Sequence, residues 1–373
     1  MAQEHVVSAN AGAKTKNDPT PSTSADSDST ATNYLRFLLD NEAPSLDDFV
    51  HLAMDVRLGI QKQNYDFINS YKKKSTENQY RSSWKKWVEF VQLKSPTCIN
   101  MDFCISFFKS LHDRGLASST INSVKSSLTV PINTAFGINL NSDLFNKIPK
   151  ACAQLRPSIK SPPISWSLGK VLDYASSIDN ESADLKLLLR KSIFLLAMAT
   201  GARLSELAAL TRDPEHVLFK ESGEVTLYPD PTFLAKNEDP YKRWDPWNIP
   251  PLPEEPSLCP VRCLQAYLNR TPDIHSGQLF RGESYGSNLS IKQIRYKMGL
   301  LIKHADPLAT WAGHDPRKVS TSLNFLHFMS FSDLQQYTGW KSPKVFFRHY
   351  LKNIQDVRHN VVAAGKVVRA AET

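Results

Sequence analysis

The sequence lacks long apolar runs, paired cysteine motifs and phosphate-binding glycine loops, and each absence excludes a class of protein. No stretch of about 18 consecutive apolar residues occurs, which excludes a membrane-spanning helix. The five cysteines form no CxxC pair, as expected for a protein of a reducing compartment. No GxxxxGKS or GxxxxGKT loop is present, so we expect no nucleotide cofactor. The first twenty residues contain no apolar signal core, so we do not expect secretion.

Positive charge is concentrated in one block of the chain. The chain has 45 Lys and Arg and 37 Asp and Glu, a formal net charge of +8. Residues 71–160 alone contain 14 Lys or Arg and 5 Asp or Glu, a difference of +9. This block therefore indicates a polyanionic partner, although an ordinary solvated surface would give the same count.

The segments before and within the basic block have distinct patterns. Residues 1–33 are rich in Ser, Thr, Ala, Asn and Asp and predict a disordered tail. Residues 34–70 predict an accessory helical segment, with a helix over 45–60 that Ser45 caps. Residues 71–158 predict a helical domain without strand alternation. Its first helix has one apolar stripe, made by Tyr80, Trp84, Trp87, Val88 and Val91.

Residues typical of helix ends predict further helices in this domain. One contains Phe103 and Phe107 and stops at Gly115, the next begins at Ser118 or Ser119 and ends at Pro131, and a last one covers 142–155.

A proline-rich stretch near residues 157–163 predicts a linker to a second domain over 159–358. Residues 183–201 form a strongly apolar pattern that predicts a buried helix ending at Gly201. Residues 224–230 predict a short strand paired with 233–239, and Pro260 begins a helix over 259–270. The expected fold class is mainly α: a helical domain, then a mostly α domain with a small antiparallel β-sheet.

Four weak signals in the second domain could support chemistry. Arg203 follows Gly201 at the start of a helix, where it could face a phosphate or simply pair with Glu206. Lys236 lies in the expected hairpin, and His314 and Arg317 share a helix face in HDPR. Trp340 follows a glycine and Tyr350 comes ten residues later; both could be ordinary packing residues.

The order of these signals resembles one family. Arg in TGxRxSEL, Lys on a hairpin, HxxR, Gly-Trp and then Tyr resembles the tyrosine recombinases (phage integrase-like) over about residues 75–355. The stretches LCPVRCLQAYLNRT, HDPRKVSTS and GWKSPKVFFRHYL resemble, more narrowly, recombinases of eukaryotic mobile elements of the DIRS, Ngaro and Crypton type.

The resemblance implies a core-binding (SAM-like) domain over 71–158, a catalytic domain over 159–358 and DNA strand cleavage and rejoining without metal or ATP. The catalytic residues that it implies are Arg203, Lys236, His314, Arg317, Trp340 and Tyr350, with Tyr350 as nucleophile and Lys236 as general acid.

Partners and location follow from the charge and from the resemblance. We expect double-stranded DNA to contact Lys72, Lys73, Lys74, Arg81, Lys85, Lys86 and Lys125. The resemblance implies four protomers on two DNA sites and a nuclear location. The apolar tail 359–373 either packs on a neighbouring protomer as a helix or frays.

The sequence leaves three alternative functions open. The chain could be a catalytically silent DNA-binding protein derived from a mobile element, or a type IB topoisomerase-like nicking and closing enzyme. A metal-dependent nuclease is the third, although we expect no metal site: Cys259 and Cys263 have CxxxC spacing without an adjacent histidine.

Overall fold

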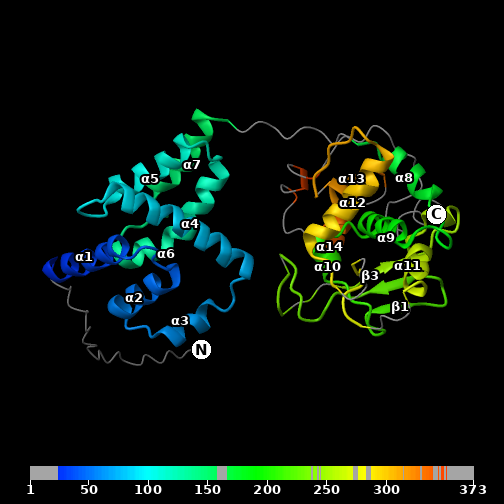
Figure 1. Cartoon of the computed structure of the whole chain (residues 1–373), viewed down its shortest axis with the longest axis horizontal. Helices are drawn as coiled ribbons and strands as arrows, with labels where there is room; N and C mark the ends of the chain where they lie inside the picture. Colours follow the sequence, from blue (N-terminus) through cyan, green and yellow to red (C-terminus); the bar gives the residue numbers. More distant parts are fainter. Residues whose placement is uncertain are drawn as a thin grey trace, which may run out of the picture. The chain divides into compact units, whose positions relative to one another are not determined.

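The structure is a computed structural model of the whole chain (Figure 1). It describes residues 24–157, 166–236, 238–241, 243, 245–271, 276–282, 287–313, 315–327 and 330–338, together with 343, 346–347 and 350. The contacts divide the chain into two compact units, Met1–Lys160 and Ser161–Thr373. Each unit is described by itself.

The described residues of the first unit form a bundle of seven helices. They are α1 (Ser24–Asp40), α2 (Leu46–Leu58), α3 (Lys62–Asn69), α4 (Lys74–Lys94), α5 (Met101–Asp113), α6 (Ser118–Phe136) and α7 (Asp143–Leu155). The predicted stripe of α4 is confirmed, because Trp84, Trp87, Val88 and Val91 are buried. The predicted cap of α2 is also confirmed: the Ser45 side chain accepts from the amide of Asp48.

The segment predicted as accessory is part of this unit's core. Tyr34, Leu38 and Phe49 are buried in the same apolar cluster as Trp84 and Trp87 of α4. The Trp84 indole also donates to the carbonyl oxygen of Pro44 at 2.8 Å. Residues 34–70 therefore contribute to the folding of the unit, beyond any role as an attachment.

Two boundaries in this unit differ from the prediction. The disordered tail was predicted to reach residue 33, but α1 begins at Ser24, because the buried side chains of Tyr34, Leu35 and Leu38 anchor a helix that extends towards the N-terminus. The prediction that Pro131 ends its helix is wrong. Pro131 lies inside α6, and the helix continues through the buried Ile132 to Gly137, whose φ of 69° ends it.

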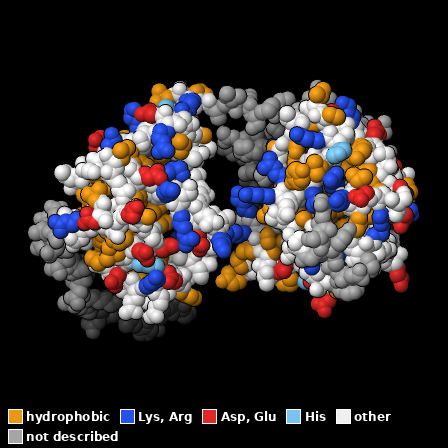
Figure 2. All heavy atoms as spheres, in the orientation of Figure 1, with side chains coloured by type: hydrophobic (Ala, Val, Ile, Leu, Met, Phe, Trp, Pro, Cys, Tyr) orange, Lys and Arg blue, Asp and Glu red, His pale blue; other side chains and the backbone are white. Residues whose placement is uncertain are grey.

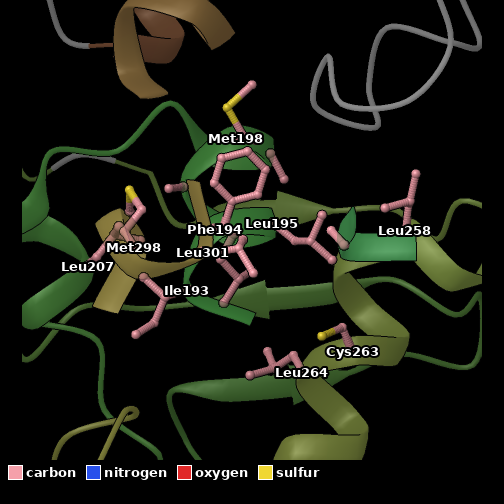
Figure 3. Packing of buried hydrophobic residues seen from close by; sticks show 14 of the residues in the cluster. Ile193, Phe194, Leu195, Met198, Leu207, Leu258, Cys263, Leu264, Met298 and Leu301 are labelled. Atoms are coloured by element: carbon pink, nitrogen blue, oxygen red, sulfur yellow. The ribbon is translucent and has the colours of Figure 1, made fainter. Parts of the chain in front are cut away.

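The second unit surrounds one buried helix. Its helices are α8 (Leu168–Ser177), α9 (Leu185–Thr200), α10 (Leu204–Ala208), the 3₁₀ turn η1 (Pro256–Leu258), α11 (Pro260–Asn269), α12 (Ile291–Ala305), α13 (Asp315–His327) and α14 (Phe331–Thr338). Helix α9 is buried along nearly its whole length, as predicted. Figure 3 shows its side chains among those of neighbouring elements, including Leu207, Cys263, Leu264, Met298 and Leu301.

A small antiparallel sheet completes this unit. Its strands β1 (Val217–Phe219), β2 (Val225–Leu227) and β3 (Trp247–Ile249) lie in that order. The predicted strand at 224–230 is confirmed by β2, but its predicted partner 233–239 is wrong. Leu227 pairs with Val217 on one side and Trp247 on the other. The partner comes from farther along the chain because 233–239 folds into a loop held by its own polar contacts.

The predicted fold class is confirmed: the described residues form fourteen α-helices and one three-stranded antiparallel sheet. Over the same residues, no helix combines the length and apolar character needed to cross a bilayer.

Candidate active site

The first site arginine lies where one helix ends and another begins. Gly201 ends α9 in the left-handed conformation, with φ of 57°, and Arg203 is the N-cap residue of α10. The backbone amide of Arg203 donates to Glu206 Oε2 at 2.7 Å, so the side chain of Glu206 caps the start of α10. The glycine turn and the cap together fix the direction of the Arg203 side chain.

The second arginine is held against the same turn. Arg317, in the first turn of α13, donates from Nη1 to the carbonyl oxygen of Gly201 at 2.6 Å. One turn later, Ser320 Oγ donates to the carbonyl oxygen of Met198 at 2.6 Å. These two bonds tie α13 to the C-terminal end of α9, since the last carbonyls of a helix have no partner within it.

Glu206 lies between the two guanidinium groups. Its Oε1 is 2.5 Å from Arg203 Nη1, and its Oε2 is 3.6 Å from Arg317 Nη1. The side chains of Arg203, Glu206 and Arg317 are 12%, 3% and 4% exposed. Two cations and one anion leave this buried cluster with one excess positive charge, which favours binding of an anion.

In the sequence, Glu206 looks like an ordinary surface partner of Arg203. The pair forms, but it is buried and shared with the second arginine. The signal that could have identified this role is the TGARLSEL motif itself, in which the acid is fixed three residues after the arginine.

Arg317 is electrostatically strained. Burial and, after it, the charge of Arg203 lower the pKa of Arg317 to about 10, although Glu206 and Tyr350 oppose the shift. Its pKa still lies well above neutral pH, so the guanidinium is charged under ordinary conditions.

Tyr350 lies against this arginine. The carbon at the centre of the Arg317 guanidinium is 5.7 Å from the centroid of the Tyr350 ring, and Arg317 donates a hydrogen bond to the tyrosine side chain. The backbone around Tyr350 is also held: its amide donates to the carbonyl oxygen of Phe346 at 2.8 Å, and its carbonyl oxygen accepts from Ser322 Oγ at 3.0 Å.

A small apolar cluster supports the segment that contains Tyr350. Its buried members are Leu334 and Phe346, and the half-buried side chains packed against them are Phe325, Phe331 and Tyr350. This cluster is separate from the main core of the unit, so the tyrosine is supported by local packing.

Lys236 lies on an exposed loop between β2 and β3. Arg243 holds this loop: it donates to Glu238 Oε1 at 2.8 Å and to the carbonyl oxygen of Pro231 at 2.9 Å. Glu238 Oε2 also accepts from the amide of Ala235 at 2.8 Å. The structure therefore fixes the base of the loop, and among the described contacts Lys236 does not touch either site arginine.

Two predicted site residues, His314 and Trp340, lie outside the described residues. The segment that leads to His314 is closely packed. A side chain at Gly313 would come within 3.1 Å of Leu204 and 3.0 Å of Arg295, and Asp315 Oδ2 accepts from the amide of Ala312 at 2.6 Å.

Most of the predicted DNA contacts are accessible on the first unit. Lys74, Arg81 and Lys85 lie on one exposed face of α4, at intervals of seven and four residues. Lys72 is half-buried over the rings of Tyr71 and Tyr80, and burial lowers its pKa. Two further predicted contacts lie on this helix or its cap: Lys73 is exposed, and Lys86 is half-buried and donates to the carbonyl oxygen of Ser82.

Lys125 does not fit the prediction of a DNA contact. It is 4% exposed, and its ammonium donates to the carbonyl oxygen of Leu140 at 3.0 Å and to Asn146 Oδ1 at 2.8 Å. The physical reason is its position on the inner face of α6, where it ties the loop before α7 to the bundle. We therefore omit Lys125 from the DNA-binding surface.

Cys259 and Cys263 are buried packing residues. Cys259 Sγ accepts from the amide of Leu252 at 3.3 Å, and Cys263 Sγ lies 3.2 Å from Ser192 Oγ. Burial raises the pKa of the Cys263 thiol to about 11. In the part of the chain that is described, no three potential metal ligands form a group.

Comparison with solved structures shows which fold the chain has. The Tn1549 transposon integrase in complex with transposon right end DNA matches with a TM-score of 0.55 and 12% identity, over 88% of this chain and 98% of that chain. The XerH site-specific recombinase bound to palindromic difH substrate matches with a TM-score of 0.54 and 14% identity, over 84% of this chain and 90% of that chain.

The chain has the tyrosine recombinase fold. Both units are covered by these matches, because each spans more than four fifths of the chain. No protein-family model and no curated protein sequence matches it. At 12% and 14% sequence identity, these matches show a shared fold and do not show a shared reaction. The chemistry of this chain must therefore be argued from its own residues.

Proposed function

We propose that the chain is a site-specific DNA recombinase, or integrase, that cleaves and rejoins DNA through a covalent 3′-phosphotyrosine intermediate. The observation that supports this function best is the meeting of Arg203, Arg317 and Tyr350 at the end of α9, with Tyr350 against the second guanidinium. A tyrosine, two arginines and excess positive charge are what attack on a phosphodiester requires.

The two arginines bind the scissile phosphate. Each guanidinium offers donors to the non-bridging oxygens, and the charge that develops there is stabilised in a buried site more strongly than in water. Glu206 orients both groups but neutralises only one of the two positive charges. His314 and Trp340 are proposed as further donors to the phosphate, as the resemblance implies.

Tyr350 is the nucleophile. Arg317 lies against Tyr350, with its guanidinium carbon 5.7 Å from the ring centroid, which holds the phenol beside the phosphate that the two arginines bind. The phenol oxygen forms a bond to phosphorus and gives up its proton to His314 or to water, while the bond to the 5′ oxygen breaks. Lys236 donates a proton to that leaving oxygen from the β2–β3 loop. Attack by a 5′ hydroxyl on the phosphotyrosine reverses these steps, rejoins the DNA strand and releases Tyr350.

The DNA duplex lies against the exposed cationic face of the first unit. Lys72, Lys73, Lys74, Arg81, Lys85 and Lys86 contact phosphates and position the duplex without reading its sequence. The two fold relatives are recombinases whose structures contain DNA, which supports DNA as the substrate class.

The biological setting rests on the sequence resemblance. The mobile-element motifs support an integrase of a eukaryotic DIRS-, Ngaro- or Crypton-type element that acts in the nucleus as a homotetramer on two DNA sites. The reaction uses neither metal nor ATP, because the phosphotyrosine conserves the energy of the phosphodiester.

The general-acid step has its own test. Lys236→Ala should slow cleavage of an ordinary phosphodiester by about 10²- to 10⁴-fold. A substrate with sulfur in place of the 5′ bridging oxygen should restore most of this loss, since a thiolate leaves without a proton. Equal defects on both substrates would contradict the role of Lys236. Lys220→Ala, on the exposed end of the β-hairpin, is the control that should cleave both substrates normally.

A further inference from the structure

The connection between α12 and α13 runs back along α12. Trp311, in this connection, packs on Gly299 of the helix, and Gly313 packs against Arg295. Gly299 and Arg295 lie six and ten residues before Ala305, the last residue of α12. These intervals correspond to about 9 and 15 Å along the helix axis, because each residue rises 1.5 Å. The chain therefore returns along most of α12 before α13 begins.

Gly299 makes room for the Trp311 ring. A Cβ atom at Gly299 would lie 2.5 Å from each of three indole atoms, Cε2, Cζ2 and Nε1. Since this distance is too short for any side-chain carbon, the indole lies directly on the backbone of α12. A glycine destabilises the middle of a helix relative to alanine, so its presence here needs a packing reason. The contact with Trp311 supplies that reason.

Arg295 also contacts the indole, from the preceding turn of α12. The carbon at the centre of its guanidinium lies 5.7 Å from the centroid of the Trp311 ring, a cation–π contact. Figure 2 shows Lys and Arg side chains on the part of the second unit where α12 lies in Figure 1, and the exposed ones on this helix are Lys292, Arg295 and Lys303. The indole is thus held on α12 by two residues one helical turn apart.

The end of the connection touches the helix that begins at the first site arginine. A Cβ atom at Gly313 would lie 3.1 Å from Leu204, the first residue of α10, and 3.0 Å from Arg295. Leu204 directly follows Arg203, and Arg317 comes four residues after Gly313. One closely packed point between α12 and α10 therefore adjoins both site arginines along the chain.

We propose that Trp311 is a positioning residue: packed on Gly299 and covered by Arg295, it fixes the connection so that α13 begins beside α10 and Arg317 faces Arg203. The two guanidiniums must converge to bind one phosphate, and a displacement of about 1 Å can slow a reaction by about 10²-fold. The expected effect on cleavage rests on the proposed function, whereas the expected effect on the place of Arg317 does not.

An exchange of volume between two residues tests this role. Gly299→Ala places a methyl group where the indole lies, so Trp311 must move. Phenylalanine lacks the indole nitrogen and the second ring, so Trp311→Phe makes room for that methyl group in the double variant. Arg295→Met is a milder variant at an exposed position. Leu264→Ala, in α11 of the same core, is the control for lost stability.

The place of Arg317 is measured on the full-length chain without DNA. Two-dimensional ¹H–¹⁵N spectra detect arginine Nε–H groups, and the Arg317 signal is the one that disappears in Arg317→Lys. Gly299→Ala should shift this signal, Arg295→Met should shift it less, and the double variant should return it towards the wild-type position. Leu264→Ala should leave it in place. If Gly299→Ala does not fold, Arg295→Met decides.

An Arg317 signal that stays unchanged in both Gly299→Ala and Arg295→Met would overturn the proposal. So would an equal shift in Leu264→Ala, or a double variant that fails to restore the signal. Each of these results would mean that Trp311 contributes packing alone.

Single-turnover cleavage at saturating DNA measures the consequence. Gly299→Ala should slow cleavage by about tenfold to 10²-fold, and the double variant should recover most of this loss. Normal cleavage by Gly299→Ala with a shifted Arg317 signal would overturn the positioning role. A wild-type chain that does not cleave, with the signal shifts as expected, would contradict the proposed function and support the positioning of Arg317 by Trp311.

Discussion

Arg317 Nη1 lies 2.6 Å from the carbonyl oxygen of Gly201, a contact between residues 116 positions apart in the sequence. It joins the first turn of α13 to the glycine that ends α9, and Arg203 follows that glycine by two residues. One backbone turn therefore sets the positions of both site arginines.

Gly201→Ala tests this dependence. The alanine must adopt a φ of 57°, so we expect a loss of roughly 1–2 kcal/mol in the free energy of unfolding by urea. Cleavage should fall beyond this loss, because the turn aims both guanidiniums. Gly137→Ala is the control: its φ of 69° imposes the same strain in the other unit. Equal loss of cleavage in both variants would contradict the positioning role of Gly201.

Replacement of Arg317 by Lys should reduce strand cleavage by about 10²–10³-fold, because a lysine cannot reproduce two converging donors. The measurement is single-turnover cleavage with DNA in excess. Arg212→Lys provides the comparison, since Arg212 is also buried, 6% exposed, and donates to Thr271 rather than to the site. Equal defects in the two variants would mean that loss of folding explains both.

Glu206→Ala should destabilise the second unit by about 3–5 kcal/mol, because it leaves two buried cations without a shared anion. Glu206→Gln should cost less, since the amide oxygen can still accept from the Arg203 amide. Urea unfolding measures both. A smaller loss for Ala than for Gln would show that the carboxylate does not hold this cluster together.

Lys85 and Lys125 should behave differently in DNA binding although both lie in the basic block. Lys85→Gln should reduce the slope of log affinity against log salt by about 0.9, the effect of one lost phosphate contact. Lys125→Met should leave that slope unchanged and lower unfolding stability by about 1–3 kcal/mol, since it removes two buried hydrogen bonds. A changed salt slope for Lys125→Met would restore Lys125 to the DNA-binding surface.

Stability should fall as the pH rises above about 8.5. Burial raises the pKa of Cys104 to about 12 and of Cys263 to about 11, so the folded chain keeps these protons while the unfolded chain releases them. Their contribution is complete below the unfolded thiol pKa and is lost as the pH rises towards the folded values. Cys104→Ala should flatten the fall between pH 9 and 11 in urea titrations, and an unchanged slope would contradict this source.

The sequence predicts best what local patterns determine. The apolar stripe of α4, the Ser45 cap and the end of α9 at Gly201 each depend on residues within one or two turns, and all three are observed. The pairing of β2 was predicted wrongly: its partners are β1, which precedes it, and β3, which lies about twenty residues away beyond a loop that Glu238 and Arg243 hold together.

Burial of charged side chains is also difficult to predict from the sequence. Glu206 and Lys125 look like surface residues in the sequence, and only tertiary packing brings Glu206 between two arginines and Lys125 onto the carbonyl oxygen of Leu140. The order of the candidate site residues predicted the fold correctly, since that order does not depend on which side chains are buried.

The most direct test of the proposed reaction is covalent trapping in EDTA with a pool of nicked duplexes of randomised sequence, resolved on a denaturing gel. We expect a protein–DNA adduct at the 3′ side of the break that is lost in Tyr350→Phe and kept in Tyr296→Phe, an exposed tyrosine of the same unit. An adduct that persists in Tyr350→Phe would contradict the assignment of the nucleophile. Binding of the duplexes without any adduct would contradict the proposed reaction itself.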